Sequence, residues 1–193
     1  MHITLMRHGR PVLASSPWLA PRDMGRWIAQ YDAAEVDPAA IPAASVAAAG
    51  ACNVIFASTL PRALASARAL GHAAPRTDAL FCEAPLPFPL WRFPRLPPAV
   101  WVVLFRLAWL GGYARGADAY AVVALRAKAA SASLVAAAAD GPVLLVGHGI
   151  LNRMIARELR RAGWTTASHQ RSGHWAATGF QSPPGPLSDS GHR

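Results

Sequence analysis

Short apolar segments that stop abruptly at polar residues are the feature of this chain that most limits how it can fold. An apolar run that is too short for a helix and is bounded by turn residues predicts a buried strand. Such segments are His2–Met6, Asn53–Ala57, Thr77–Phe81 and Val143–Val146, and Trp175–Phe180 predicts a last, edge strand. The chain therefore builds a sheet from segments that lie far apart in the sequence.

Segments with apolar residues at helical spacing separate these strands. Helices are expected over Arg22–Tyr31, Ala43–Ala49, Thr59–Leu70, Val100–Leu110, Asp118–Ala139 and from Ile150 to Gly163, with Ser58 and Thr59 as an N-terminal capping pair. Strands that alternate with helices predict a mostly parallel sheet with helices on both faces. We predict a single α/β domain, a three-layer α/β/α sandwich over residues 1–180, and a disordered tail over 181–193.

The region of about 84–116 interrupts this alternation. Prolines at 85, 87, 89, 94, 97 and 98 exclude regular structure before the helix predicted at 100–110. We interpret the region as an inserted proline-rich and helical cover. Its large aromatic residues are either core residues or an apolar cover over the site: Trp91, Phe93, Trp101 and Trp109.

Several classes of protein are excluded by the sequence. The longest apolar run, residues 99–112, contains Arg106 and is shorter than the roughly 20 residues that span a bilayer, so no membrane partner is expected. The N-terminus does not have the pattern of a secretory leader. Cys52 and Cys82 are too few for a disulfide framework and lack the partners of a zinc site. We expect a soluble, cytoplasmic protein.

The net charge indicates an anionic partner without identifying it. Lysines and arginines number 19 against 10 acidic residues, which gives a net charge of +9 and a pI of about 11.2. A GC-rich genome explains many of the arginines equally well. Arg153, Arg157, Arg160 and Arg161 are expected to form a solvated helical face, so nucleic acid is not the expected partner.

Polar residues follow the ends of four predicted strands, where parallel sheets bind ligands. They are Arg7 and His8, Ser58 and Arg62, Glu83, and His148. Two arginines suit a tetrahedral dianion, because each guanidinium can donate paired hydrogen bonds to phosphate oxygens. A neutral histidine can attack phosphorus, and a carboxylic acid can protonate the departing oxygen. These residues predict phosphoryl transfer through a phosphohistidine, and the acidic residues are too few for a two-metal centre.

Three motifs carry a resemblance to a known family. Arg7-His8-Gly9, the run from Ser58 to Ala67 and Gly147-His148-Gly149 each follow a predicted strand. In this order they resemble the histidine phosphatase superfamily, also called phosphoglycerate-mutase-like. The resemblance covers about residues 1–165. It implies that His8 is the nucleophile, with its second ring nitrogen held by a backbone carbonyl. It also implies that the reaction needs no metal and no organic cofactor.

The resemblance also implies roles for the other candidates. Arg7, Arg62 and His148 would form the phosphate pocket, and Gly9 and Ser58 are included among the phosphate-binding residues. Glu83 lies where the family often places its general acid. Asp78 and Glu35 are the alternative acids.

The sequence departs from the family pattern at two places. In this sequence, Pro11 and Ala14 stand at positions after the first motif that often hold Thr or Ser and Asn in the family. The comparison with the family pattern therefore predicts one phosphate contact fewer. The Gly-x-Trp-Glu-Gly stretch that often follows the acid is replaced by residues 84–89. This replacement and the short chain argue against a glycolytic mutase and favour a phosphatase.

These observations lead to one leading function and two alternatives. We expect a phosphomonoesterase that hydrolyses a small phosphorylated metabolite through phosphorylated His8. The alternatives are a phosphatase of phosphohistidine on proteins, and a weakly active member that binds anions or nucleic acid as a scaffold. The remaining histidines are expected at the surface or in packing roles: His2, His72, His169, His174 and His192. The sequence does not indicate the oligomeric state.

Overall fold

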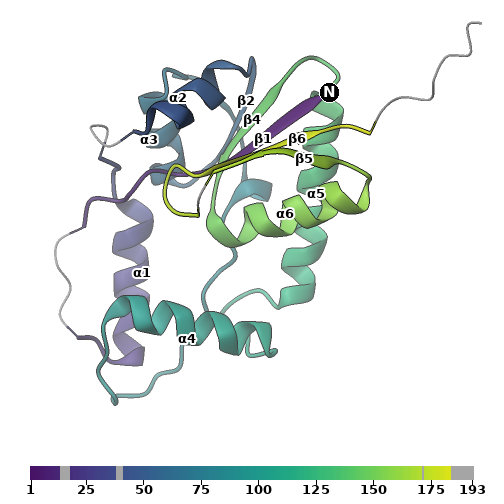
Figure 1. The fold of residues 1–193 in the computed structure, drawn as a ribbon. Coiled ribbons are helices and arrows are strands. Elements are labelled where there is room, and N and C mark those ends of the chain that lie inside the picture. The colour runs from purple at the N-terminus through teal and green to yellow at the C-terminus, as the bar shows by residue number, and fades with distance from the viewer. Residues whose placement is uncertain (14–17, 38–40, 171, 184–193) are drawn as a thin grey trace, which may run out of the picture.

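The computed structural model describes residues 1–13, 18–37, 41–170 and 172–183, which form a six-stranded sheet covered by helices (Figure 1). The strands lie in the order β3-β2-β4-β1-β6-β5. Four of them are parallel: β1 (His2–Arg7), β2 (Val54–Ser58), β3 (Arg76–Asp78) and β4 (Val143–Gly147). β6 (Ala177–Gln181) runs antiparallel to both β1 and β5 (Thr165–His169). The predicted mostly parallel α/β fold is confirmed.

All six predicted helices are present, with ends shifted by a few residues. They are α1 (Met24–Ala33), α2 (Ala43–Gly50), α3 (Pro61–Ala69), α4 (Pro98–Leu110), α5 (Tyr120–Ala137) and α6 (Gly149–Arg161). The predicted capping pair of α3 is wrong. Leu60 is the N-cap residue, and the Ser58 hydroxyl instead accepts a hydrogen bond from the Leu60 amide at 3.2 Å.

The two faces of the sheet carry separate cores. On one face, Ile3, Leu5 and Leu145 pack with α5 and α6. On the other face, Leu144 and Val146 pack with α2 and α3. Every residue of β4 is buried, as expected for a central strand of a parallel sheet.

One described helix, α5, is long and apolar enough to cross a membrane by length and composition alone. Its buried residues recur every three or four positions and join the core of the sheet: Val123, Ala127, Ala130 and Leu134. Buried residues at this spacing are typical of a helix that packs one side on the core of a globular domain.

Three strand predictions need correction. The strand predicted at Thr77–Phe81 is shorter, because Asp78 accepts a hydrogen bond from the Leu80 amide at 2.8 Å and starts a 3-10 turn over Ala79–Phe81. The strand at Thr165–His169 was not predicted, because all its residues are exposed and it has no apolar run. Trp175 lies before β6 rather than in it, whereas Gln181, assigned to the tail, belongs to β6. Residues 184–193 lie outside the described part of the chain.

The loop before β6 fixes the backbone that carries the first motif. The Arg7 amide donates to the Ala176 carbonyl at 3.0 Å, and the Trp175 amide donates to the Arg7 carbonyl at 3.1 Å. The buried Trp175 ring lies against Gly9, where an added Cβ would be 2.4 Å from Trp175 Cζ2. Gly9 is therefore required for the close packing of the Trp175 ring.

We predict that Gly9→Ala lowers the free energy of unfolding by about 1–3 kcal/mol, because the new methyl group must displace a buried indole ring. Gly50→Ala is the matched control, since nothing lies within 4 Å of its added Cβ. It should leave stability unchanged or raise it by up to about 1 kcal/mol. Urea denaturation of both variants measures the difference, and equal midpoints would contradict the packing role of Gly9.

Candidate active site

The carboxyl ends of the parallel strands bring the predicted site residues together. Arg7 ends β1 opposite Gly147 of β4, and the His8 amide donates to the Gly147 carbonyl at 2.9 Å. This pairing places the rings of His8 and His148 with their centroids 5.1 Å apart. Arg62, in the first turn of α3, reaches His8 from the end of β2.

The hydrogen bonds of His8 define its tautomer. Nδ1 lies 2.7 Å from the Gly9 carbonyl oxygen, and Nε2 lies 3.2 Å from Arg62 Nε. A carbonyl only accepts and a guanidinium only donates, so Nδ1 carries the proton and Nε2 presents its lone pair. The backbone carbonyl contact that the family resemblance implied is present.

Burial and positive charge keep three neighbouring histidines neutral at pH 7. Burial, followed by the charge of Arg62, lowers the pKa of His8 to about 3. The same two causes, in the same order, hold the pKa of His148 well below its ordinary value. Burial and then Arg7 lower the pKa of His174 to about 4. The positive charge of the site therefore belongs to its arginines.

Arg62 is held in place by two residues of α1 that no sequence motif marks. Its Nη1 donates to Asp32 Oδ1 at 2.5 Å, and its guanidinium carbon lies 4.9 Å from the centre of the Tyr31 ring. A local signal for this pairing is missing, because α1 meets α3 only in the folded chain.

Arg7 and His148 contain buried polar atoms that have no hydrogen-bond partner among the described residues. These atoms are Nε of Arg7 and both ring nitrogens of His148. Unpaired buried polar groups are rare, because each costs about 1–3 kcal/mol. An anion with several oxygens is the type of ligand that can pair with a guanidinium and an imidazole together.

Glu83 caps helix α6 and also faces the site. Its Oε2 accepts from the Ile150 amide at 3.1 Å, and its Oε1 accepts from the amides of Leu151 and Ala84, both at 3.0 Å. These contacts satisfy amides in the first turn of α6, just after His148. Because Glu83 lines the same cavity as His8, it is both a capping residue and a candidate acid.

Ser58 and Gly9 have positions other than those expected of phosphate ligands. Ser58 is fully buried, and its hydroxyl lies 3.4 Å from Cys82 Sγ, outside the cavity. The Gly9 amide donates to Ser66 Oγ at 2.8 Å. Ser66 in turn donates to the Arg62 carbonyl at 2.6 Å, so it joins the two motifs although it was not among the predicted site residues.

His174 lies beside His8, although the sequence indicated no more than a surface or packing role for it. Its ring centroid lies 5.3 Å from that of His8, and its Nδ1 lies 3.3 Å from the His8 carbonyl oxygen. The loop before β6 brings it there. Nothing near it in the sequence indicates a site, because the contact depends on antiparallel pairing between β1 and β6.

The alternative acids and motif positions lie elsewhere. Asp78 caps its own 3-10 turn, and neither Asp78 nor Glu35 lines the cavity that contains His8. Pro11 pairs with Val36 in an isolated bridge, whereas Ala14 lies outside the described residues. In the part of the chain that the structure describes, no group of three His, Cys, Asp or Glu side chains is placed to hold a metal ion.

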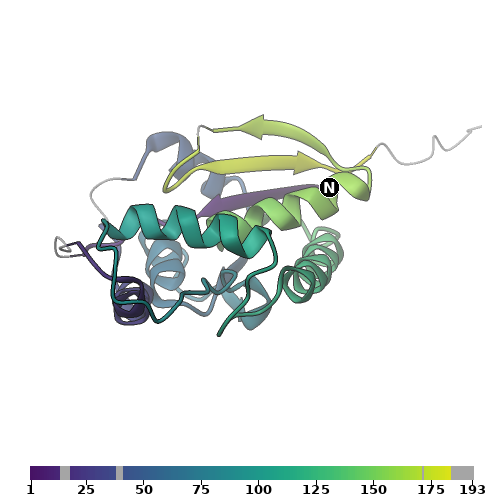
Figure 2. The same cartoon turned by 90° about the horizontal axis from the view of Figure 1, so that it is seen from below.

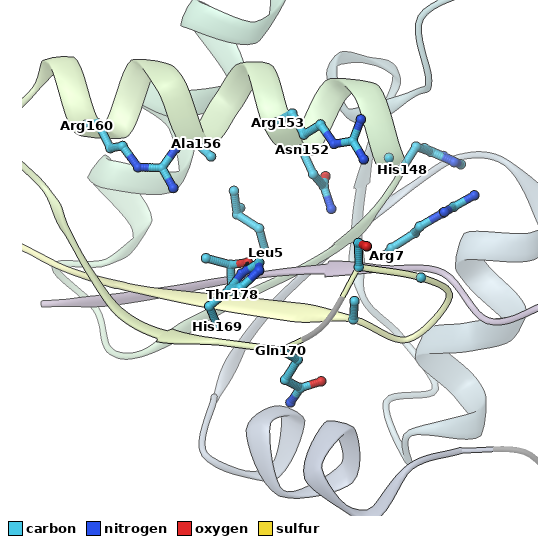
Figure 3. A pocket seen from close by; sticks show the side chains of 14 residues that line it. Leu5, Arg7, His148, Asn152, Arg153, Ala156, Arg160, His169, Gln170 and Thr178 are labelled. Carbon is cyan, nitrogen blue, oxygen red and sulfur yellow. Dashed lines mark hydrogen bonds between the residues drawn. The ribbon is translucent and has the colours of Figure 1, made fainter. Parts of the chain in front are cut away.

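Two cavities meet at Arg7. The larger, of about 760 Å³, extends from His8, Arg62 and Glu83 toward α1 and α4. The smaller, of about 200 Å³, lies between α6 and the β5–β6 hairpin and contains His148, Arg153 and Arg160 (Figure 3). His8, whose Nε2 carries the lone pair, lines the larger of these two cavities and not the smaller one.

The chain matches known proteins in its three-dimensional structure. No protein-family model and no curated protein sequence matches the chain. A mycobacterial glucosyl-3-phosphoglycerate phosphatase is 26% identical, with 83% of this chain and 82% of that chain covered and a TM-score of 0.54.

Two other solved structures share the fold at lower identity. A phosphoglycerate mutase from Thermus thermophilus is 19% identical, with 93% and 92% of the two chains covered and a TM-score of 0.55. A phosphoserine phosphatase from Entamoeba histolytica is 16% identical, with 93% and 90% covered and a TM-score of 0.53. The chain therefore has the fold of the histidine phosphatase superfamily, and the resemblance that its three motifs indicated is confirmed.

Proposed function

We propose that the protein is a phosphomonoesterase that needs no metal and works through a phosphohistidine on His8. The observation that carries the proposal is the neutral, buried His8 ring. Its Nε2 lone pair faces Arg62, and its Nδ1 proton is held by the Gly9 carbonyl. Phosphatases and a mutase among the structures that share the fold support this reaction class.

In the first step, Arg7, Arg62 and His148 bind the phosphate oxygens. Nε2 of His8 forms a bond to phosphorus while the bond from phosphorus to the ester oxygen breaks. The Gly9 carbonyl stabilises the positive charge that develops on the ring, and the arginines stabilise the charge on the equatorial oxygens.

The leaving oxygen takes a proton from Glu83 in this proposal. Oε2 accepts one amide hydrogen bond and Oε1 accepts two, so we assign proton transfer to Oε2. In the second step a water oxygen attacks phosphorus, its proton passes to Glu83, and the bond to Nε2 breaks. The products are an alcohol and inorganic phosphate, and His8 returns to its neutral form.

The cover over His8 favours a small phosphorylated substrate. The cavity is lined by residues of α1, α4 and the segment from Cys82 to Phe88. A phosphohistidine on the surface of another protein would have to enter beneath this cover, so we favour the small molecule over the protein substrate. We place the reaction in the cytoplasm, and we assign it no metal, cofactor or nucleic-acid partner.

The first prediction concerns the nucleophile. The wild-type protein should hydrolyse p-nitrophenyl phosphate in the presence of EDTA, and His8→Ala should lower kcat by about 1,000-fold or more, because the attacking nitrogen is lost. His72→Ala, which changes a histidine that lines neither cavity, is the matched control. A rapid-quench experiment should trap a phosphoprotein that is labile in acid and stable in base. Turnover retained by His8→Ala would refute the covalent step.

The second prediction separates the acid and capping roles of Glu83. Glu83→Gln keeps a carbonyl oxygen for the α6 amides but has no proton to transfer. It should slow hydrolysis of an alkyl phosphate by about 100-fold or more, and that of p-nitrophenyl phosphate far less, because nitrophenolate leaves without a proton. Glu35→Gln should change neither rate. Equal slowing of the two substrates would assign Glu83 to capping alone.

A further inference from the structure

We infer that the substrate is the phosphomonoester of an apolar alcohol, with the hydrocarbon part held between α1 and α4. This inference rests on the proposed function and names its substrate class. An apolar substrate requires apolar walls beyond the phosphate site, whereas a polar metabolite requires hydrogen-bonding groups there. The walls of the cavity decide between the two.

The cavity is polar at one end and apolar at the other. Arg7, His8, Arg62 and Glu83 form the polar end. Apolar side chains from α1, the 82–88 segment and α4 form the rest, among them Trp27, Leu86, Phe88 and Val102. A volume of about 760 Å³ lies within the range of pockets that bury most of a ligand.

The few charged side chains near the apolar end are already engaged. The Asp32 carboxylate binds Arg62. Arg106 donates to the carbonyls of Ala84 and Pro85 at 3.0 and 3.4 Å, and its guanidinium lies 5.0 Å from the centre of the Trp109 ring. A substrate with several hydroxyl groups would bury them against side chains that offer few partners, which is unfavourable.

Alkyl phosphates of increasing length test the inference. From ethyl to octyl phosphate, kcat/KM should rise by up to roughly fourfold per methylene, the gain that burial of a methylene in an apolar site provides. The kcat/KM of each alkyl phosphate should exceed that of 3-phosphoglycerate. Val102→Asn should flatten this rise. Val103→Asn, the next residue on α4 but 58% exposed, should leave it unchanged.

The outcomes separate the two proposals. Hydrolysis of all the esters with no gain along the series, or a preference for 3-phosphoglycerate, would overturn the apolar substrate and keep the phosphatase. In that case Arg106 becomes a candidate for binding a carboxylate. Hydrolysis of none of the esters would refute the proposed function and this inference with it.

The outer face of α4 is apolar and exposed, and this leads to a second, independent inference. Apart from Arg106 the helix is apolar, and its outward side chains are exposed at 41–60%: Val100, Val103, Leu104, Leu107 and Leu110. Leu90, Trp91 and Phe93 in the preceding loop are 61–73% exposed. Among the described residues, these are eight of the fourteen exposed large hydrophobic residues. Figure 1 places α4 at the bottom of the molecule, and in Figure 2 no other helix or strand lies in front of it.

The charges around this face favour an anionic partner. Residues 84–117 contain four arginines and no acidic residue. Arg92, Arg95 and Arg115 are exposed beside the two ends of α4. In a two-fold dimer these like charges would be brought into one interface, whereas an anionic lipid surface neutralises them. We propose that the α4 face docks on an anionic membrane surface. The length of the apolar run, which argued against a membrane partner, excludes spanning but not docking.

Sedimentation with phosphatidylglycerol vesicles tests the docking surface. The wild-type protein should bind, and binding should weaken with salt and in neutral phosphatidylcholine vesicles. Val103→Asp with Leu107→Asp should weaken it at least tenfold. The control pair Val122→Asp with Leu125→Asp lies on α5, where these residues are 52% and 70% exposed, and should bind as wild type does.

Equal binding by the two double variants would overturn the assignment of the α4 face. A dimer that forms without vesicles and is lost only in the α4 variant would overturn the lipid partner in favour of a second copy. Turnover of p-nitrophenyl phosphate should be unchanged in both variants, because neither pair lines the cavity.

Discussion

The parallel pairing of β1 with β4 is the constraint on which the site depends. It aligns Arg7 with Gly147, so that His8 and His148 leave the sheet side by side. The four core residues of each strand, from Ile3 to Met6 and from Val143 to Val146, are buried, and a shift of register by one residue would exchange the two faces of the core. The hydrophobic core therefore fixes the distance between two histidines that do not themselves stabilise it.

The charge state of these histidines follows from their burial and from the arginines around them. Burial keeps His8, His148 and His174 uncharged, so the positive charge next to these rings is carried by arginines, among them Arg7 and Arg62. Asp32 offsets part of this charge by binding Nη1 of Arg62, while Nε of the same guanidinium faces His8. In the proposed reaction, the remaining positive charge would attract a phosphate dianion, which would also pair with the orphaned nitrogens of Arg7 and His148.

Helix α4 contacts three different surroundings: the core beside α1, the cavity and the solvent. One side packs Trp101 and Phe105 near α1, a second presents Ala99 and Val102 to the cavity, and a third is exposed. A helix that is apolar all round is normally buried on every side. The exposed apolar side is therefore the feature that the docking proposal explains, whereas the inner sides are accounted for by the core and the cavity. Of the aromatic residues expected in this region, Trp101 and Trp109 are core residues, and Trp91 and Phe93 are exposed.

The sequence by itself determined the alternation of strands and helices, the parallel sheet and the positions of Arg7, His8, Arg62, Glu83 and His148. Each of these residues follows a strand or opens a helix, so local patterns and the geometry of parallel sheets are enough to bring them together. The tertiary structure alone decided the roles of Asp32, Ser66 and His174, because they reach the site from α1, from the second turn of α3 and from the loop before β6. Contacts between segments so distant in the chain leave no periodicity in the sequence. The same reason explains the missed strand β5, whose exposed residues are held by pairing with β6 and not by a hydrophobic pattern of their own.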